Sequence, residues 1–325
     1  MNPSASPVPL PLRLDPEPGE SLNGFLLRLT ERNGRKHPRE ILGIQAAQVS
    51  FPGYGTDPEF AKTLSIIAGR PVGSLLPLCA ERTGSSEVAG APLLRYQGQL
   101  LRPFDLHHRQ RSVCPACLAE QVVHRARWDL LGLGDCSRHG TQLIWRCPAC
   151  DEAIGWDRCG MSACRCGADM RRAEVPASRE DRLALATYLE GRMEGEAVVG
   201  PTLLDGLELY QAIRVMLLLG ALRLGARPWG VAYHARAQDR HDLLSTGFKL
   251  AGTRAGGIVH LLDGLPALFG REPTGILHMI EGYGWMAASR NEDVRQTGLV
   301  LLDISREAER GLPVPLKPLR KAWLS

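Results

Sequence analysis

The chain has 325 residues, of which 44% are apolar and 23% are charged, and its formal net charge is +4. These proportions are typical of a globular protein with two or three domains, and the positive excess is too small for a protein that coats polyanions. The first residues show no charged and then apolar signal region, and the longest apolar run, 215–222, is much shorter than the roughly 20 residues of a membrane span. We therefore expect a cytoplasmic protein without a membrane segment.

The N-terminal part, residues 1–105, has the pattern of a helical domain. Ser21 is a good N-cap for a first helix, and Gly34 stands where a glycine would end it. A second helix is predicted from Pro58 to Gly69, followed by a short third one. A helix, a glycine turn and a second helix are the elements of a helix-turn-helix. The same pattern also serves ordinary helical packing, and the sequence leaves both interpretations open.

The rest of the helical pattern lies at the other end of the chain, in residues 173–325. Small residues between Thr83 and Gly98 predict a linker, and residues 171–178 predict a second boundary. Residues 203–224 carry apolar side chains on nearly every side, which is typical of a buried core helix. Further helices are predicted over residues 241–250, 257–269, 273–283 and 291–310.

Cysteines are concentrated in the middle segment, residues 106–172. Eight of the nine lie between Cys114 and Cys166, and all of these except Cys159 form closely spaced pairs with each other or with a histidine. Zinc binds four such ligands in a tetrahedron, so two pairs make one closed site and four pairs make two. Taken in order, the predicted ligands are Cys114, Cys117, Cys136 and His139 for one ion and Cys147, Cys150, Cys164 and Cys166 for a second.

These predicted zinc sites are structural, because protein ligands fill all four positions and leave none for water. Cys159 lies five residues before Cys164 and is an alternative ligand of the second site. Gly167 favours the choice of Cys164 and Cys166, since a glycine lets the backbone turn with a positive φ after the last ligand. No nucleotide-binding P-loop, nucleophile elbow or deaminase zinc motif is present in the sequence. We expect a protein that is not an enzyme.

Several arginines and one lysine are candidate contacts with nucleic acid or a protein partner. They follow the first predicted helix and the last cysteine pair: Arg35, Lys36, Arg39, Arg171 and Arg172. Phosphate groups and acidic side chains are the partners that such residues prefer. The alternative is that they belong to solvated loops without a partner.

Two blocks of the sequence together resemble the TniQ family. Residues from Pro16 to Asn33 contain a Pro-Gly-Glu-Ser-Leu sequence followed by Phe25 and Arg28, which is similar to the family's N-terminal signature. The cysteine pairs, with Trp128 ahead of the Cys-x-x-His pair, are similar in order to its tandem zinc ribbons. The resemblance covers roughly the first 172 residues. Beyond them the chain resembles the family only in being helical.

The resemblance implies a mainly α fold, with helical domains on either side of tandem zinc ribbons that contain small β-hairpins. It implies an adaptor for target-site selection in DNA transposition, which links a complex that marks a DNA site to an AAA+ ATPase regulator of the transposon. Target DNA is a further implied partner. In CRISPR-associated transposons the marking complex is an RNA-guided effector such as Cascade with its guide RNA, and a homodimer is one form of the adaptor. The sequence leaves both of these open.

A second class of function fits the same sequence. An autonomous DNA-binding transcriptional regulator would use the predicted helix-turn-helix elements and the zinc-containing segment to bind one DNA sequence without an ATPase. It would show a steep salt dependence of DNA affinity, because phosphate contacts release counterions. An adaptor would instead require its protein partners.

Overall fold

The computed structural model describes residues 7–42, 58–83, 93–107, 110–156, 160–223 and 237–252, with isolated positions between 286 and 299. The chain divides into two compact units, Met1–Val198 and Val199–Ser325. Cys159, the helices predicted over 257–269 and 273–283, and most of the one over 291–310 lie outside the described residues. The division into domains 1–105, 106–172 and 173–325 stays a prediction.

The first unit begins with a group of short helices around one apolar core. Their bounds are α1 Leu22–Arg32, α2 Pro38–Leu42, α3 Pro58–Ala68 and α4 Val72–Leu75, and Leu76–Leu78 continues α4 as a 3₁₀ turn. Leu26, Phe60 and Leu64 are among the buried side chains that join α1 and α3. The predicted first helix and its start are confirmed, since the Ser21 side chain accepts a hydrogen bond from the Gly24 N–H.

Backbone geometry explains where α1 ends. Gly34 has a φ of +65°, its N–H donates to the Glu31 carbonyl, and the Arg35 N–H donates to the Thr30 carbonyl. These two bonds form a Schellman motif, which favours glycine at the left-handed position. The chain then continues into α2, a helix that the sequence pattern did not predict. A helix-turn-helix therefore stays a prediction.

A small antiparallel sheet follows the helices and corrects the predicted linker. Its strands are β1 Glu81–Arg82, β2 Leu94–Tyr96 and β3 Gln99–Leu101, in the order β1-β2-β3. Gln97 and Gly98 both have positive φ, which is the two-residue turn that suits a right-twisted hairpin. The prediction of a linker from Thr83 to Gly98 is thus wrong for its last six residues, 93–98, because the side chains of Leu94 and Tyr96 are buried.

The cysteine-rich segment consists mainly of turns, with little regular structure. Its elements are the 3₁₀ turn Pro103–Asp105, α5 Pro115–Glu120, the 3₁₀ turn Ala126–Asp129, β4 Asp135–Cys136, β5 Thr141–Gln142 and the 3₁₀ turn Met170–Arg172. The strands β4 and β5 are antiparallel, with Cys136 opposite Thr141. The predicted small hairpins of the zinc-ribbon segment are therefore present. Trp128 and Trp156 are buried within this segment and pack its interior.

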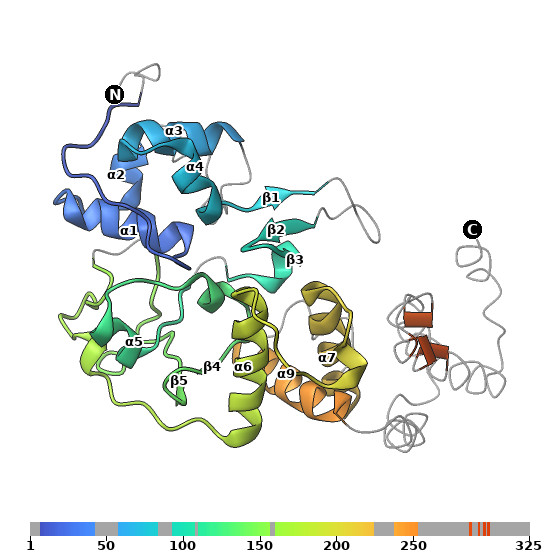
Figure 1. The fold of residues 1–325 in the computed structure, drawn as a ribbon. Helices are drawn as coiled ribbons and strands as arrows, with labels where there is room; N and C mark the ends of the chain where they lie inside the picture. Colours follow the sequence, from blue (N-terminus) through green and yellow to red (C-terminus); the bar gives the residue numbers. More distant parts are fainter. Residues whose placement is uncertain are drawn as a thin grey trace, which may run out of the picture. The chain divides into compact units, whose positions relative to one another are not determined.

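Helix α6, Glu180–Met193, closes the first unit and contacts β4 (Figure 1). In the second unit a 3₁₀ turn, Thr202–Leu204, precedes α7 Leu209–Arg223 and α9 Ala237–Ala251. The helices α7 and α9 pack closely, since a Cβ at Gly220 would collide with the Leu243 carbonyl. The predicted buried helix is thus present from Leu209. None of the helices in the described part of the chain is long and apolar enough to cross a bilayer.

Candidate metal centre

The first group of predicted metal ligands meets where α5 packs against the β4–β5 hairpin. Cys114 is the N-cap of α5 and Cys117 lies in its first turn, because Pro115 is well suited to the first helical position. Cys136 ends β4, and His139 lies in the hairpin loop before Gly140, whose φ is +61°. We call these four residues, Cys114, Cys117, Cys136 and His139, the first cluster; their ligand atoms lie within 4.8 Å of one another.

The spacing of these atoms fits a tetrahedral zinc ion. Ligand sulfurs at about 2.3 Å from zinc are about 3.8 Å apart, and a sulfur and an imidazole nitrogen are about 3.6 Å apart. The Sγ atoms of Cys117 and Cys136 are 3.7 Å apart, and the three cysteine sulfurs lie 3.2 to 3.7 Å from His139 Nδ1. The first cluster could therefore hold a metal ion, and its three thiols and imidazole are a donor set that zinc accepts.

The thiols of the first cluster also influence one another's ionisation. Hydrogen bonds from Cys117 and Cys136 lower the pKa of the Cys114 thiol. The pKa of the Cys117 thiol is raised, first by its hydrogen bond with Cys114, and that of Cys136 is raised to about 11 for the same reason. One thiolate therefore hinders the ionisation of its neighbours. A divalent cation removes this conflict, because zinc binds cysteines as thiolates.

Glu120, which the sequence analysis missed, determines which histidine nitrogen faces the sulfurs. His139 Nε2 lies 2.9 Å from Glu120 Oε1, and Arg138 forms an ion pair with the same carboxylate at 2.8 Å. The hydrogen bond from His139 lowers the pKa of Glu120. An Nε2–H that donates to a carboxylate leaves Nδ1 free to bind metal, and such carboxylates orient histidine ligands in many metal sites. The sequence contained one hint: Glu120 comes one helical turn after Cys117 on α5.

A second carboxylate reaches the first cluster from α6. Glu190 is 2% exposed, and its Oε2 accepts a hydrogen bond from the Ser137 N–H at 3.1 Å and another from the Ser137 hydroxyl. Arg127 Nε lies 3.3 Å from Glu190 Oε1, and Arg127 also pairs with Glu194. Burial raises the pKa of Glu190, whereas Arg127 and the Ser137 hydroxyl lower it. Fifty-three positions separate Glu190 from Ser137, and no local pattern in the sequence indicated this contact.

The second group of predicted ligands is held by two short turns. A bridge between Arg146 and Ala153 closes the turn that carries the first pair, and a bridge between Ala163 and Asp169 closes the other. Gly167 has a φ of +90°, as its place after the last ligand predicted. We call Cys147, Cys150, Cys164 and Cys166 the second cluster; their sulfurs also lie within 4.8 Å of one another.

Distances in the second cluster match the same tetrahedron. Cys147 and Cys166 Sγ are 3.8 Å apart, and Cys150 and Cys164 Sγ are 3.7 Å apart. Burial raises the pKa of Cys164, but hydrogen bonds from the Cys166 backbone and the other thiols outweigh this and lower it to about 7. The second cluster could thus also hold a metal ion such as zinc. The assignment of all eight residues as metal ligands stays a prediction.

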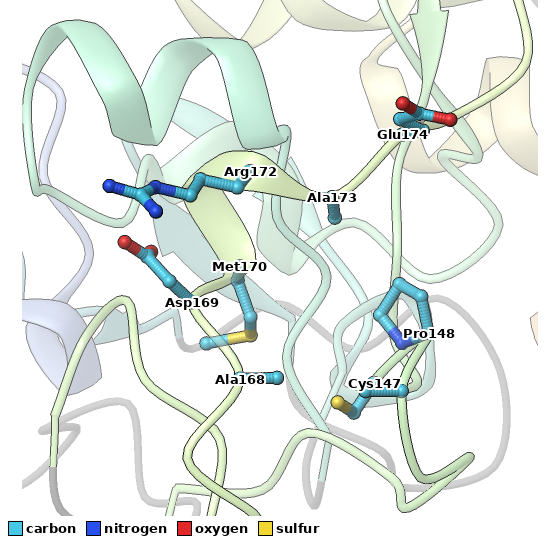
Figure 2. A pocket seen from close by; sticks show the side chains of 9 residues that line it. Cys147, Pro148, Ala168, Asp169, Met170, Arg172, Ala173 and Glu174 are labelled. Carbon is cyan, nitrogen blue, oxygen red and sulfur yellow. The ribbon is translucent and has the colours of Figure 1, made fainter.

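The two clusters differ in exposure. The three cysteines of the first cluster are buried and His139 is partly buried, whereas Cys150 and Cys166 of the second cluster are exposed. A shallow pocket of ≈ 280 Å³ lies beside the second cluster, and Figure 2 shows Met170 and Ala168 on one side of it and Pro148 and Cys147 on the other. Small side chains and backbone form most of its lining. The lining also includes the charged residues Asp169, Arg172 and Glu174, of which Asp169 is paired with Arg171.

The N-terminal Pro-Gly-Glu-Ser sequence joins α1 to the cysteine-rich segment. The Ser21 N–H donates to the His124 carbonyl at 3.0 Å, and the Ala126 N–H donates to the Gly19 carbonyl at 2.8 Å. The Ser21 hydroxyl, whose oxygen accepts from the Gly24 N–H, donates to His124 Nδ1 at 2.8 Å, because the Ser112 carbonyl places the proton of the neutral imidazole on Nε2. The Pro-Gly-Glu-Ser sequence therefore connects α1 to the cysteine-rich segment through buried hydrogen bonds.

His124 completes this connection as a neutral side chain. Its Nε2–H donates to the Ser112 carbonyl at 3.0 Å, and its ring packs edge-on against Trp128 and Trp156. Burial, with a smaller contribution from Arg111, lowers the pKa of His124 well below its ordinary value. Both ring nitrogens are engaged in structural hydrogen bonds. A hydroxyl beside an imidazole here thus stabilises the fold and has no access to a substrate. His107, at the start of the cysteine-rich segment, is also buried.

The candidate contact residues lie on the surface of the first unit. Arg35 and Lys36 are exposed in the turn between α1 and α2, and Arg39 is exposed at the start of α2. Arg171 forms an ion pair with Asp169 at 2.7 Å, and Arg172 is exposed near the pocket of Figure 2. Nothing in the geometry assigns them a ligand, and their role in partner contact stays a prediction.

The family model described as TniQ matches residues 11–143. This match supports membership of the TniQ family. The match includes the N-terminal signature and all four ligands of the first cluster, whereas the second cluster and α6 lie beyond it. No curated protein matches the chain at significant similarity. The TniQ domain indicates a transposition-associated adaptor, and TniQ is a family without catalytic activity.

Proposed function

We propose that this protein is a non-enzymatic adaptor for target-site selection in DNA transposition, which links a complex that marks the target to an AAA+ ATPase regulator. The TniQ domain over residues 11–143 is the observation that carries this proposal. Two structural zinc ions, one in each cluster, belong to the proposal. They would hold a segment that has few regular elements of its own.

The closed ligand sets support a structural role for zinc. A catalytic zinc ion keeps one position for water or substrate, whereas each cluster offers four protein ligands at tetrahedral spacing. Zinc supplies charge neutralisation and cross-linking when bound there, and the thiolates and His139 hold it. The chain's own residues do the rest: Glu120 orients His139, and the turns of the second cluster position its sulfurs.

The experiment that tests the adaptor is affinity purification of the full-length protein with the AAA+ ATPase of the same transposon. We expect co-purification that requires ATP and target DNA and that is lost without nucleotide. A Cascade complex with its guide RNA is included in parallel, because binding to it would identify RNA-guided targeting. Failure to bind the ATPase under every condition would overturn the proposal. Metal analysis of the same preparation should give two zinc ions per chain.

Autonomous DNA recognition is the second candidate function, and the exposed basic turn between α1 and α2 favours it. Replacing Arg35 and Arg39 with glutamate reverses the charge of that turn without altering buried residues. A DNA-binding regulator would lose its footprint on one DNA sequence in this variant and would show a steep salt dependence. An adaptor that needs its partners would show no sequence-specific footprint on its own, with or without the substitutions.

A further inference from the structure

Helix α6 presents a buried carboxylate to the loop that carries two ligands of the first cluster. Ser137 directly follows Cys136 and lies two residues before His139, and both of its donors bind Glu190 of α6. The bond from the Ser137 N–H matters most, since it fixes the main chain of the loop. Glu190 therefore constrains the path of the backbone between the two ligands.

The hydrogen-bonding pattern separates this role from that of an ordinary ion pair. Among the described residues, all hydrogen bonds of the Glu190 carboxylate go to Ser137. Arg127 lies 3.3 Å from its other oxygen and compensates its charge without hydrogen-bond geometry. A buried ion pair contributes little net stability compared with apolar packing, so stability alone is a weak reason to place a carboxylate here. A carboxylate that binds the metal loop's backbone has a positional effect that an apolar side chain lacks.

The same contact acts on α6 in the opposite direction. The apolar side chains Leu185, Leu189 and Met193 recur every four residues and are buried. Glu190 is buried as well, and it directly follows Leu189. A metal ion in the first cluster holds the loop that supplies Ser137. If the loop moved, a buried carboxylate would lose its donors, which is costly in a protein interior. Because thermodynamic coupling is reciprocal, docking of α6 through this contact favours metal binding, and metal binding favours docking of α6 to the same extent.

We propose that Glu190 is a positioning residue of the first metal site, and that a metal ion in the first cluster orders helix α6 through Glu190 and Ser137. This inference rests on the metal occupancy given under the proposed function. Its consequence reaches beyond the TniQ match, because α6 lies outside residues 11–143 and is the last helix before the second unit begins at Val199. Metal in the TniQ domain thus determines whether the chain entering the second unit is a docked helix.

The test uses the full-length zinc-loaded protein and the variants Glu190→Ala and Glu190→Gln. Glu194→Gln is the matched control: Glu194 also lies at the end of α6 and pairs with Arg127, but it has no contact with the loop. Zinc content is measured first, and metal release from each cluster is then followed with a chelator. The two sites are distinguished by ¹¹³Cd spectra of the substituted protein, since three thiolates with an imidazole and four thiolates give separate resonances.

We expect Glu190→Ala to speed release from the first cluster by about 10- to 100-fold, the usual effect of losing a group that supports a metal ligand, and to leave the second cluster unchanged. Glu190→Gln retains an acceptor for the Ser137 N–H and should recover part of the wild-type rate. Hydrogen exchange in the wild type should show α6 losing protection as the first cluster loses metal, while α1 stays protected. Glu194→Gln should behave as the wild type.

Two results would overturn the inference, and they have different meanings. If two ions bind but release from the first cluster is unaffected by Glu190→Ala, and α6 stays protected after metal removal, the coupling is absent although the metal sites stand. If the purified chain binds no metal in the first cluster, the assignment of that site fails, and the coupling fails with it.

Discussion

The two cysteine clusters have nearly the same ligand chemistry but very different surroundings. The first is enclosed by α5, the β4–β5 hairpin and α6, and two carboxylates, Glu120 and Glu190, support the loop that carries His139. The second is held by two turns closed by single bridges, and Cys150 and Cys166 are exposed. Equal spacing of ligands in a sequence therefore does not imply equal integration into a fold. The first cluster is part of the core, whereas the second cluster only connects two local turns.

Replacing one ligand in each cluster should give the largest difference. Cys136→Ser removes a buried ligand at the point where α5, the hairpin and α6 meet, so we expect the cysteine-rich segment and α6 to lose cooperative folding. Binding of structural zinc supplies on the order of 10 kcal/mol to folding, comparable with the whole stability of a domain. Cys166→Ser removes an exposed ligand and should lower the midpoint of thermal unfolding by about 5 °C. Circular dichroism and metal analysis measure both effects. Equal losses from the two variants would contradict the comparison.

The carboxylate that orients His139 offers a smaller perturbation. Glu120→Gln keeps the side-chain shape but weakens the hydrogen bond that fixes Nδ1 toward the sulfurs. We expect the metal affinity of the first cluster to fall by about 10- to 100-fold, as measured by competition with a chelator of known affinity. Glu152→Gln is the control, because Glu152 lies beside the second cluster and its carboxylate is 3.8 Å from exposed Arg165. An equal loss of affinity in the control would show that carboxylates near the clusters act through general charge alone.

Exposure should determine the order in which the wild type loses its metals. A chelator or an alkylating reagent reaches Cys150 and Cys166 without prior opening of the structure, whereas the first cluster must open locally. We expect two phases of zinc release, with the faster phase on the order of ten times faster than the slower one. Mass spectrometry should find alkylation at Cys150 and Cys166 during the fast phase. Alkylation that begins at Cys114 or Cys117 would reverse the proposed order.

The sequence predicted those parts of the site that depend on neighbouring residues. The ligand pairs are local, with at most two residues between partners, and the cap of α1 at Ser21 and its end at Gly34 are local as well. Contacts between distant residues left no pattern. The Ser21–His124 hydrogen bond spans 103 positions, and the Glu190–Ser137 bond spans 53.

The failure to predict the small sheet has a different cause, because the sequence does contain a strand pattern there. Leu94 and Tyr96 alternate with a polar residue ahead of the Gln97-Gly98 turn, which is typical of a hairpin strand. The small residues that precede them suggested a linker and concealed this pattern. Composition over a window of about fifteen residues therefore gave the wrong prediction, where period-two alternation over the residues before the turn would have indicated the strand.

Two aspartates provide the smallest and most specific contrast between the surroundings of the clusters. Asp129 follows Trp128 in the buried 3₁₀ turn, and burial raises its pKa to about 8, although the hydrogen bond from the Tyr96 hydroxyl at 2.7 Å opposes this. Asp169, beside the second cluster, is partly exposed to solvent, and hydrogen bonds from Arg171 lower its pKa to about 2. The two carboxyl groups should therefore give stability opposite dependences on pH.

The raised pKa of Asp129 means that the folded chain favours the neutral acid. Its contribution is fully present below the ordinary pKa of 3.8, and it is lost as the pH rises toward about 8. Asp129→Asn resembles the neutral acid and keeps an acceptor for Tyr96. The free energy of unfolding of this variant should therefore fall less than that of the wild type between pH 4 and 8, by up to about 1.4 kcal/mol per pH unit. Asp169→Asn should change stability only in acid, because that contribution is lost as the pH falls from 3.8 through about 2. Urea unfolding at several pH values measures both variants, and parallel curves for wild type and Asp129→Asn would show that this carboxyl is ionised in the fold.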